Sequence, residues 1–183
     1  MKHLLLVAAL TLPLLHSVAI AAKDNPSNET AANNPFTAER NKAIGNLSTS
    51  IVILQKMGSE CKNQAKLSED KIKSSLNKWI ERNKTYLQMH ADYMNGYFAT
   101  IRQFEGEEQA KKVVNDMGKV FNEQANTVVQ LTLEKNGKSE ACLKYFQLLG
   151  EGKMDIKIGY PDYKILTEMV EYSKRNTPQA GNK

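Results

Sequence analysis

One histidine is the residue best suited to chemistry in this chain. His90 is the only histidine after the first 21 residues, and an imidazole can act as a general base, a metal ligand or a haem ligand. Met89 and Met94 flank it, and Met117 could face it from a neighbouring helix. The same region holds no second histidine, no CxxCH motif and no dense methionine repeat. We therefore expect His90 to be a hydrogen-bonded histidine at a core boundary, and we predict no metal and no cofactor.

Carboxylates offer a second chemistry, general acid–base catalysis. Glu105, Glu107, Glu108 and Asp155 are the candidates, because they fall near helix ends or in an irregular segment. A glycosidase-type pair needs two carboxylates about 5–9.5 Å apart in different environments, whereas acids at a helix start favour the helix dipole without any catalysis. No GxSxG, glycine-rich phosphate loop or HExxH motif accompanies them. The prediction is a protein that is not an enzyme.

The two cysteines, Cys61 and Cys142, could be free thiols or partners in a disulfide. A nucleophilic thiol normally needs a base nearby, and His90 is the one histidine on offer. An even number of cysteines in an oxidising compartment favours a disulfide. Such a bond would close a loop of about 80 residues and stabilise the fold by roughly 4 kcal/mol.

The N-terminal 21 residues are typical of a secretory signal peptide. Lys2 and His3 precede an apolar run over residues 4–15, and Ala19 and Ala21 place small residues where a signal peptidase reads. The run is too short to be a membrane anchor, and we expect no later membrane span. The net charge is +5, but the basic residues are mixed with acidic ones along the chain. A nucleic-acid-binding protein usually concentrates its basic residues on one face, so we expect no nucleic-acid partner. We therefore expect a periplasmic protein.

Apolar spacing of three and four residues predicts an all-α protein, a disulfide-tied bundle of four to five helices with one long helix. Residues 22–35 are polar and are expected to be flexible, residues 36–175 to form the helical domain, and residues 176–183 to be disordered. Thr37 and Ser68 are the expected N-caps of the first two helices. The second helix is expected to run for about 36 residues to Gly106, with a kink near Asn83 or Gly96.

The second half of the chain shows three further elements. A third helix is expected from Glu107 to the Asn-Gly pair at 136–137, and a short one, capped by Ser139, from there to Gly150. Residues 151–159 break the helical pattern, and the alternation of Met154, Ile156 and Ile158 predicts an extended strap. Pro161 and Asp162 are expected to open the last helix.

Aromatic side chains on the long helix are the candidate interface. Tyr86, Tyr93 and Tyr97 lie on one side of that helix together with His90. Such residues anchor protein interfaces because they bury a large area and lose few rotors. The alternative, which we favour, is that they fill the bundle core and that their hydroxyls reach its rim.

Trp79, Arg82 and Asn83 form a candidate structural anchor. The tryptophan is expected in the core. Arg82 is expected to lie over its ring or to pair with an acid, and Asn83 to hydrogen bond at a helix contact.

Several short motifs resemble known families. The export signal, Cys61, the W-x-x-R-N run at 79–83 and the segment CLKYFQLLGEGKMDI at 142–156 resemble uncharacterised small helical periplasmic proteins of Gram-negative bacteria, over roughly residues 50–160. This resemblance implies an all-helical, disulfide-tied periplasmic domain and brings no established activity. The segments YMNGYFATI and YKILTEMVEYSKRNTP are also similar to parts of helical periplasmic immunity proteins, which neutralise secreted cell-wall-degrading effectors.

The leading hypothesis is therefore an exported protein that acts by binding a protein partner, for example as an immunity or inhibitor protein against a secreted effector. The alternative is an envelope chaperone or stress protein, although the LTxxQ-like repeat of known helical envelope chaperones is missing from the sequence. A cofactor-binding protein or enzyme is a further alternative.

Overall fold

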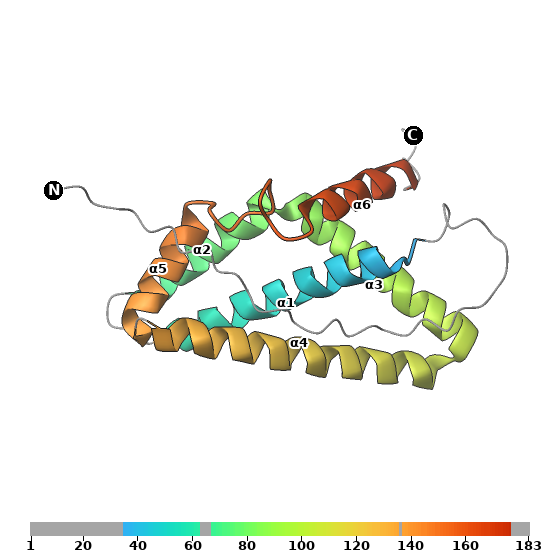
Figure 1. The fold of residues 1–183 in the computed structure, drawn as a ribbon, viewed down its shortest axis with the longest axis horizontal. Helices are drawn as coiled ribbons and strands as arrows, with labels where there is room; N and C mark the ends of the chain where they lie inside the picture. The colour runs from blue at the N-terminus through green and yellow to red at the C-terminus, as the bar shows by residue number, and fades with distance from the viewer. Residues whose placement is uncertain (1–34, 63–66, 136, 177–183) are drawn as a thin grey trace. The chain divides into compact units, whose positions relative to one another are not determined.

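The computed structural model describes residues 35–62, 67–135 and 137–176. The chain divides into a unit of residues 1–33 and a unit of residues 34–183, and all statements below concern the second unit. The expected signal peptide, nearly all of the expected flexible segment and residues 177–183 of the expected tail lie outside the described residues. Within the described ranges the structure is all-helical and contains no strand, which confirms the predicted all-α class (Figure 1). It contains six helices there rather than the predicted four to five, because the expected long helix is divided into two. The helices are α1 (Ala38–Cys61), α2 (Glu69–Arg82), α3 (Lys84–Glu105), α4 (Glu107–Lys135), α5 (Lys138–Gly150) and α6 (Tyr163–Asn176).

Side-chain hydroxyls begin the first two helices, as predicted. Thr37 accepts a hydrogen bond from the backbone N–H of Arg40 at 3.3 Å, and Ser68 accepts one from that of Lys71 at 3.3 Å. Each bond satisfies a backbone donor that has no partner inside the helix. The predicted cap at Ser139 is wrong. The N-cap of α5 is Gly137, whose φ of 78° lies in the left-handed region that glycine adopts without strain.

The predicted helix of about 36 residues is interrupted at Asn83, one of the two positions where a kink was expected, and the chain forms α2 and α3 instead. The backbone N–H of Asn83 is shared between the carbonyls of Trp79 at 3.0 Å and Ile80 at 3.2 Å. Its side-chain amide also donates to the carbonyl of Trp79 at 2.7 Å. An asparagine that binds nearby backbone in this way competes with the helical hydrogen-bond ladder. The longest described helix is instead α4, with 29 residues.

The segment between α5 and α6 is a series of turns rather than an extended strap. The backbone N–H of Asp155 bonds to the carbonyl of Gly152, and that of Tyr160 bonds to the carbonyl of Lys157. The alternation predicted that Met154, Ile156 and Ile158 would all face the core. Ile156 is buried, at 5% exposure, but Ile158 is 87% exposed, so the prediction is wrong for the last of the three.

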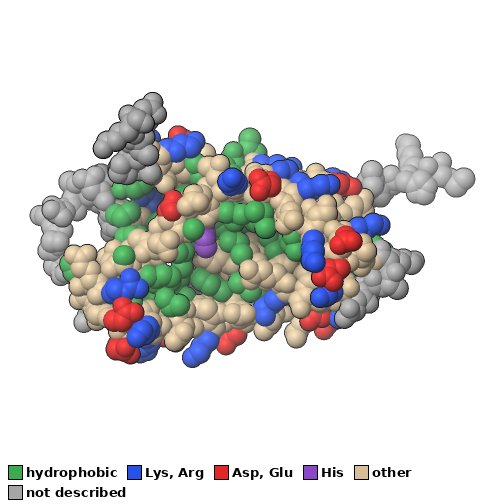
Figure 2. Space-filling model, turned by 180° about the vertical axis from the view of Figure 1, so that it is seen from behind, with side chains coloured by type: hydrophobic (Ala, Val, Ile, Leu, Met, Phe, Trp, Pro, Cys, Tyr) green, Lys and Arg blue, Asp and Glu red, His purple; other side chains and the backbone are tan. Residues whose placement is uncertain are grey.

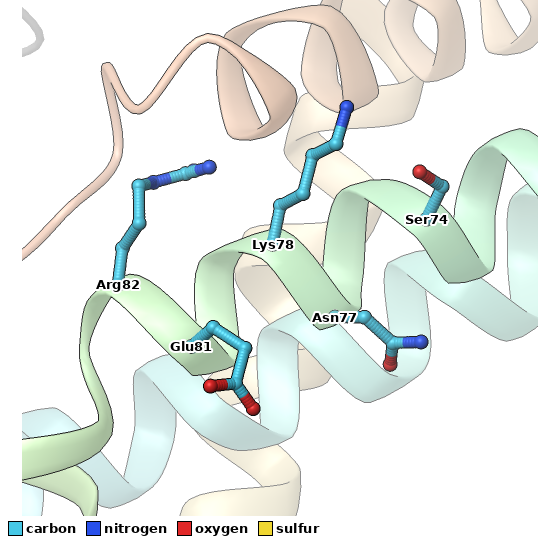
Figure 3. Close-up of a pocket in the computed structure, with 5 residues that line it drawn as sticks. All are labelled: Ser74, Asn77, Lys78, Glu81 and Arg82. Atoms are coloured by element: carbon cyan, nitrogen blue, oxygen red, sulfur yellow. The ribbon is translucent and has the colours of Figure 1, made fainter.

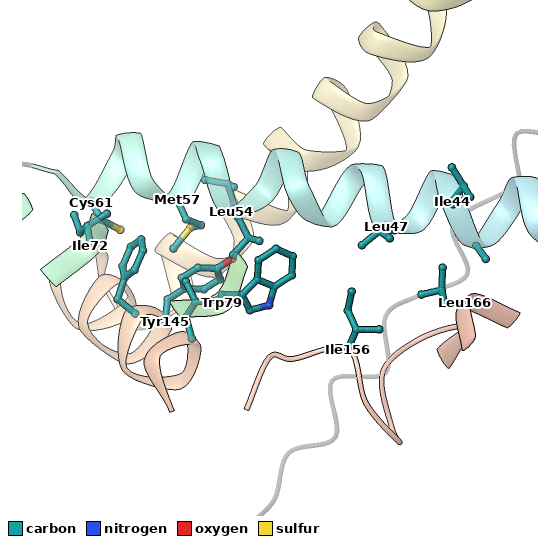
Figure 4. Packing of buried hydrophobic residues seen from close by; sticks show 14 of the residues in the cluster. Ile44, Leu47, Leu54, Met57, Cys61, Ile72, Trp79, Tyr145, Ile156 and Leu166 are labelled. Carbon is teal, nitrogen blue, oxygen red and sulfur yellow. The ribbon is translucent and has the colours of Figure 1, made fainter. Parts of the chain in front are cut away.

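Helix α1 occupies the centre of the unit. It packs against α4, α2, α5 and α6, while α2 pairs with α5, and α3 packs against α4 and α6 (Figure 1). Contact on several sides explains why α1 carries buried residues around much of its surface. The buried cluster extends along α1 and includes side chains from several other elements (Figure 4). From α1 come Ile44, Leu47 and Met57, and from the other elements come Trp79, Tyr145, Phe146, Leu149, Ile156 and Leu166.

A disulfide joins Cys61 at the end of α1 to Cys142 in α5, as predicted. Their Cα atoms lie 5.6 Å apart, and both residues are fully buried. The bond ties positions separated by 81 residues in the sequence. In the ranges that the structure describes, no helix is both long enough and apolar enough to cross a bilayer.

Candidate functional site

Arg82 clamps the segment between α5 and α6 to the end of α2. Its guanidinium makes a two-bond ion pair with Asp155, with Nε–Oδ2 at 2.6 Å and Nη2–Oδ1 at 3.1 Å. Nη2 also donates to the carbonyl of Leu149 at 2.6 Å, and Nη1 donates to that of Gly150 at 3.4 Å. A planar guanidinium suits this geometry, which an ammonium could not reproduce. The clamp therefore satisfies carbonyls at the end of α5 and positions the turn that follows.

Asn83 and Trp79 complete this clamp from the buried side. Asn83 is 1% exposed, and its Oδ1 accepts a hydrogen bond from the backbone N–H of Ile156 at 2.7 Å. Trp79 is 3% exposed, and its indole N–H donates to the carbonyl of Met154 at 2.9 Å. Three side chains of one short run thus hold residues 149–156, and we call this set the clamp. Its role in the described structure is to hold one segment against another.

The candidate carboxylates have separate roles. Asp155 is committed to the clamp, where Gly152 makes room for it: a Cβ atom at Gly152 would lie 2.7 Å from the Asp155 Oδ2 atom. Glu107 and Glu108 open α4 and form ion pairs with Arg102 at 2.5 Å and Lys111 at 3.1 Å. Glu105 ends α3 and is exposed.

The three tyrosines of α3 make contacts inside the molecule. The Tyr86 hydroxyl lies 3.3 Å from the Thr167 hydroxyl on α6, and the Tyr93 hydroxyl donates to Asn41 on α1 at 2.8 Å. The ring of Phe36 packs against those of Tyr93 and Tyr97, with centroids 5.1 and 5.4 Å apart. Burial raises the pKa of each tyrosine above its ordinary value, so all three stay neutral. The half-buried rings thus link α3 to α1 and α6.

His90 lies between α3 and α1. Its Nε2 atom is 2.7 Å from the hydroxyl of Ser48, a residue of α1 that is only 6% exposed. Burial alone lowers the pKa of the imidazole below its ordinary value, so His90 is neutral at pH 7. In the described part of the chain every buried side-chain nitrogen and oxygen has a hydrogen-bond partner. The hydrogen bond that described residues make to this ring uses Nε2. Because no buried nitrogen of the described residues is left without a partner, the Nδ1 atom is partly accessible to solvent.

Apolar side chains share helix faces with His90 and with its partner Ser48. Leu87 and Met94 lie three residues before and four residues after His90, on the same face of α3, and Ile51 lies one turn after Ser48 on α1. All three are partly buried against the core. Figure 2 shows the histidine (purple) on a face where hydrophobic side chains gather and charged side chains lie mainly toward the edges. We call His90, Leu87, Met94 and Ile51 the His90 patch.

Two adjoining shallow hollows lie along α2. One has a volume of about 600 Å³ and is lined by Ser74, Asn77, Lys78, Glu81 and Arg82 (Figure 3). The other, of about 640 Å³, lies between α2 and α5, with Lys71 and Lys78 on its α2 side and Leu143 and Phe146 on its α5 side. Figure 3 shows that Lys78 and Arg82 point to one side of α2, while Asn77 and Glu81 point to the other. The positive charge of Arg82 is already neutralised by Asp155.

The described residues contain no group of three or more His, Cys, Asp or Glu side chains that could hold a metal ion. No protein-family model matches the chain, and neither a curated protein nor a solved structure is significantly similar to it.

Sequence reasoning did not find Ser48 or Asn41, the α1 partners of His90 and Tyr93. A mid-helix serine or asparagine carries no signal for such a role, because its partner lies in a different helix.

Proposed function

We propose that this protein is an exported binding protein that acts by contact with a protein partner through the His90 patch. The observation that carries the proposal is the composition of that surface: apolar side chains around a neutral imidazole whose Nδ1 atom faces solvent. Apolar area supplies most of the favourable free energy of association, and a single oriented polar group restricts how a partner can bind. A partner segment with apolar side chains and one hydrogen-bonding group for Nδ1 would fit.

The rigidity of the surrounding structure also supports a role in binding. The buried disulfide and the clamp hold the helices against one another, and a preorganised surface loses less conformational entropy when it binds. A disulfide persists in oxidising compartments, which favours the periplasm as the location. An immunity or inhibitor protein against a secreted effector would need these properties, and we propose this as the partner class.

The test compares the chain with two patch variants, Leu87→Glu and Met94→Glu, as baits in a pull-down from periplasmic extract. The control is Leu131→Glu, which places the same charge on α4 at a position that is already 62% exposed. Any protein retained by the wild type is identified, purified and titrated. We expect both patch variants to weaken binding at least tenfold and the control to bind as the wild type does. Equal binding by all four proteins would show that the partner uses another surface.

An envelope chaperone is the second candidate, favoured by several well-exposed apolar side chains. Phe104 is 76% exposed and Ile158 is 87% exposed. A chaperone would suppress the aggregation of unrelated unfolded proteins and would lose this activity gradually as such side chains are replaced. A specific binder would leave aggregation unchanged in the same assay.

A further inference from the structure

The backbones of α1 and α3 pack less closely than those of α1 and its other helical neighbours. The helices that pack closely against α1 are α2, α4, α5 and α6, whereas α3 packs against α4 and α6. The hydrogen bonds found between α1 and α3 are Ser48–His90 and Asn41–Tyr93, with the ring of Phe36 packed beside Tyr93. Because the two backbones do not pack closely, this contact can loosen locally while the rest of the core around α1 stays packed.

His90 is the group in this contact whose charge changes near neutral pH. Tyr93 stays neutral there, because burial raises its pKa. Around the contact, α1 presents Arg40, which lies over the Tyr172 ring at 4.9 Å, and Lys56, two turns from Ser48. None of the charged side chains contributes to the shift in the pKa of His90, which comes from burial. The helices near His90 also carry charged side chains at exposed positions. They include Lys42 on α1, Lys84 and Asp92 on α3, Glu123 on α4, and Lys164 and Glu168 on α6.

We propose that His90 is an acid-responsive link between α1 and α3, and that proton uptake by its imidazole separates the two helices locally and increases the exposure of the apolar side chains of the His90 patch.

The chemistry of the hydrogen bond supports this. A neutral imidazole can accept from the Ser48 hydroxyl or donate to it, whereas a charged imidazole has donors on both nitrogens. Ser48 must then accept, and its own proton must turn to a carbonyl of α1 because the side chain is almost fully buried. The charged ring would also lie among Leu87, Met94 and Ile51 with no carboxylate beside it. Water solvates that charge better, so the protonated side chain is favoured outside the contact.

The direction of the pH dependence follows from linkage. The pKa of His90 in the folded protein lies below its ordinary value of 6.5, so over the interval between these two values the open or unfolded state binds more protons. The contact is therefore fully stable above pH 6.5, weakens as the pH falls through that interval, and changes no further below the folded-state pKa. The population of the open state rises by at most tenfold per pH unit, because one proton is taken up.

The experiment follows an apolar fluorescent dye, anilinonaphthalene sulfonate, with the exported chain between pH 7.5 and 4.5. Far-UV circular dichroism of the same samples reports whether the helices persist. We expect the dye fluorescence of the wild type to rise at least twofold, with a midpoint below pH 6.5 and unchanged helix content. His90→Gln, which keeps a neutral polar side chain, should show no rise. The carboxylates are the same in both proteins, so an equal rise in both would overturn the proposal, as would a wild type that binds no more dye at low pH.

A second measurement keeps the proposal testable if His90→Gln folds poorly. The imidazole resonance of His90 in the wild type is followed by NMR over the same pH range. It should titrate below pH 6.5, together with shifts in backbone resonances of α1 around Ser48. Ser48→Ala should bring the midpoint closer to 6.5 and increase dye binding at pH 7.5. A titration midpoint of His90 at or above pH 6.5 would contradict the link. So would backbone resonances of α1 that do not shift when His90 titrates.

Discussion

Replacing Asn83 with alanine tests whether the clamp stabilises the fold. The change removes the Oδ1 atom that accepts the backbone N–H of Ile156 at 2.7 Å. Ile156 is 5% exposed and Asn83 is 1% exposed, so water reaches the orphaned donor poorly. A buried donor left without a partner costs about 1–3 kcal/mol. The carbonyl of Trp79 loses the side-chain amide but keeps the backbone N–H of residue 83, so we assign no further cost there.

Asn83 lies in the break between α2 and α3 rather than inside a helix, so no gain in helix propensity offsets this cost. The expected loss in the free energy of unfolding is therefore about 1–3 kcal/mol. With a urea slope of about 2 kcal/mol per molar, the unfolding midpoint falls by about 0.5–1.5 M. The fluorescence of Trp79, the only tryptophan, reports unfolding directly because its indole lies in the clamp.

The matched control is Asn77→Ala, on the exposed side of α2. It replaces an exposed asparagine by alanine without removing a buried hydrogen bond. Equal stability of the two variants would refute the reasoning, because the buried contacts of Asn83 would then contribute nothing to stability.

A charge variant tests the side-chain oxygen and the side-chain nitrogen of Asn83 separately. Asn83→Asp keeps an oxygen for the Ile156 N–H but places a second carboxylate where the amide nitrogen lay 3.4 Å from Asp155 Oδ1. Like charges at this distance disfavour one another, so we expect destabilisation that shrinks when Asp155→Asn is added. An unchanged effect in the double variant would show that the two side chains do not interact.

Two further predictions concern the disulfide and the turn that receives the clamp. Replacing Cys61 and Cys142 by serine should lower the free energy of unfolding by about 4 kcal/mol; reducing agent should destabilise the wild type, measured by urea unfolding, and leave the double variant unchanged. Gly152→Ala should cost more than Gly159→Ala. Both glycines have positive φ, 72° and 95°, which costs a residue with a Cβ atom about 1–2 kcal/mol, but only at Gly152 does the added Cβ also meet Asp155. Equal midpoints for these two variants would show that the carboxylate moves aside without cost.

Local signals in the sequence predicted the helix starts that depend on neighbouring residues. Thr37 and Ser68 precede acidic residues within one helical turn, and each hydroxyl finds its backbone donor three residues ahead. The pairing of Cys61 with Cys142 was also predictable, because a chain with two cysteines allows one intramolecular disulfide. Ser139 carried the same kind of signal as Ser68 and misled, because Gly137 already provides the backbone conformation that begins α5.

A kink was expected near Asn83 or Gly96, but spacing alone could not choose between the two positions and could not assign the clamp. The hydrophobic period runs through Asn83 without interruption, and the helix ends there because its side chain bonds to Trp79 and Ile156. The acidic partner of Arg82 could not be predicted either, because the chain contains many acids and Asp155 lies 73 residues further along it. The strap prediction failed at Ile158 for the same reason: the turns that aim these side chains are held by the clamp rather than by their own alternation.

The sequence by itself determined the class of this protein: a helical unit with two hydroxyl-capped helices and one disulfide. These features depend on interactions within a few residues, or on a pairing with a single intramolecular solution. Only the tertiary structure decided where the aromatic face of α3 points and what His90 touches. Tyr86, Tyr93 and Tyr97 link α3 to its neighbours, and His90 bonds to Ser48 with its second nitrogen toward solvent. The physical reason is that a helical period states which residues share a face, whereas the packing of the other helices decides what covers it.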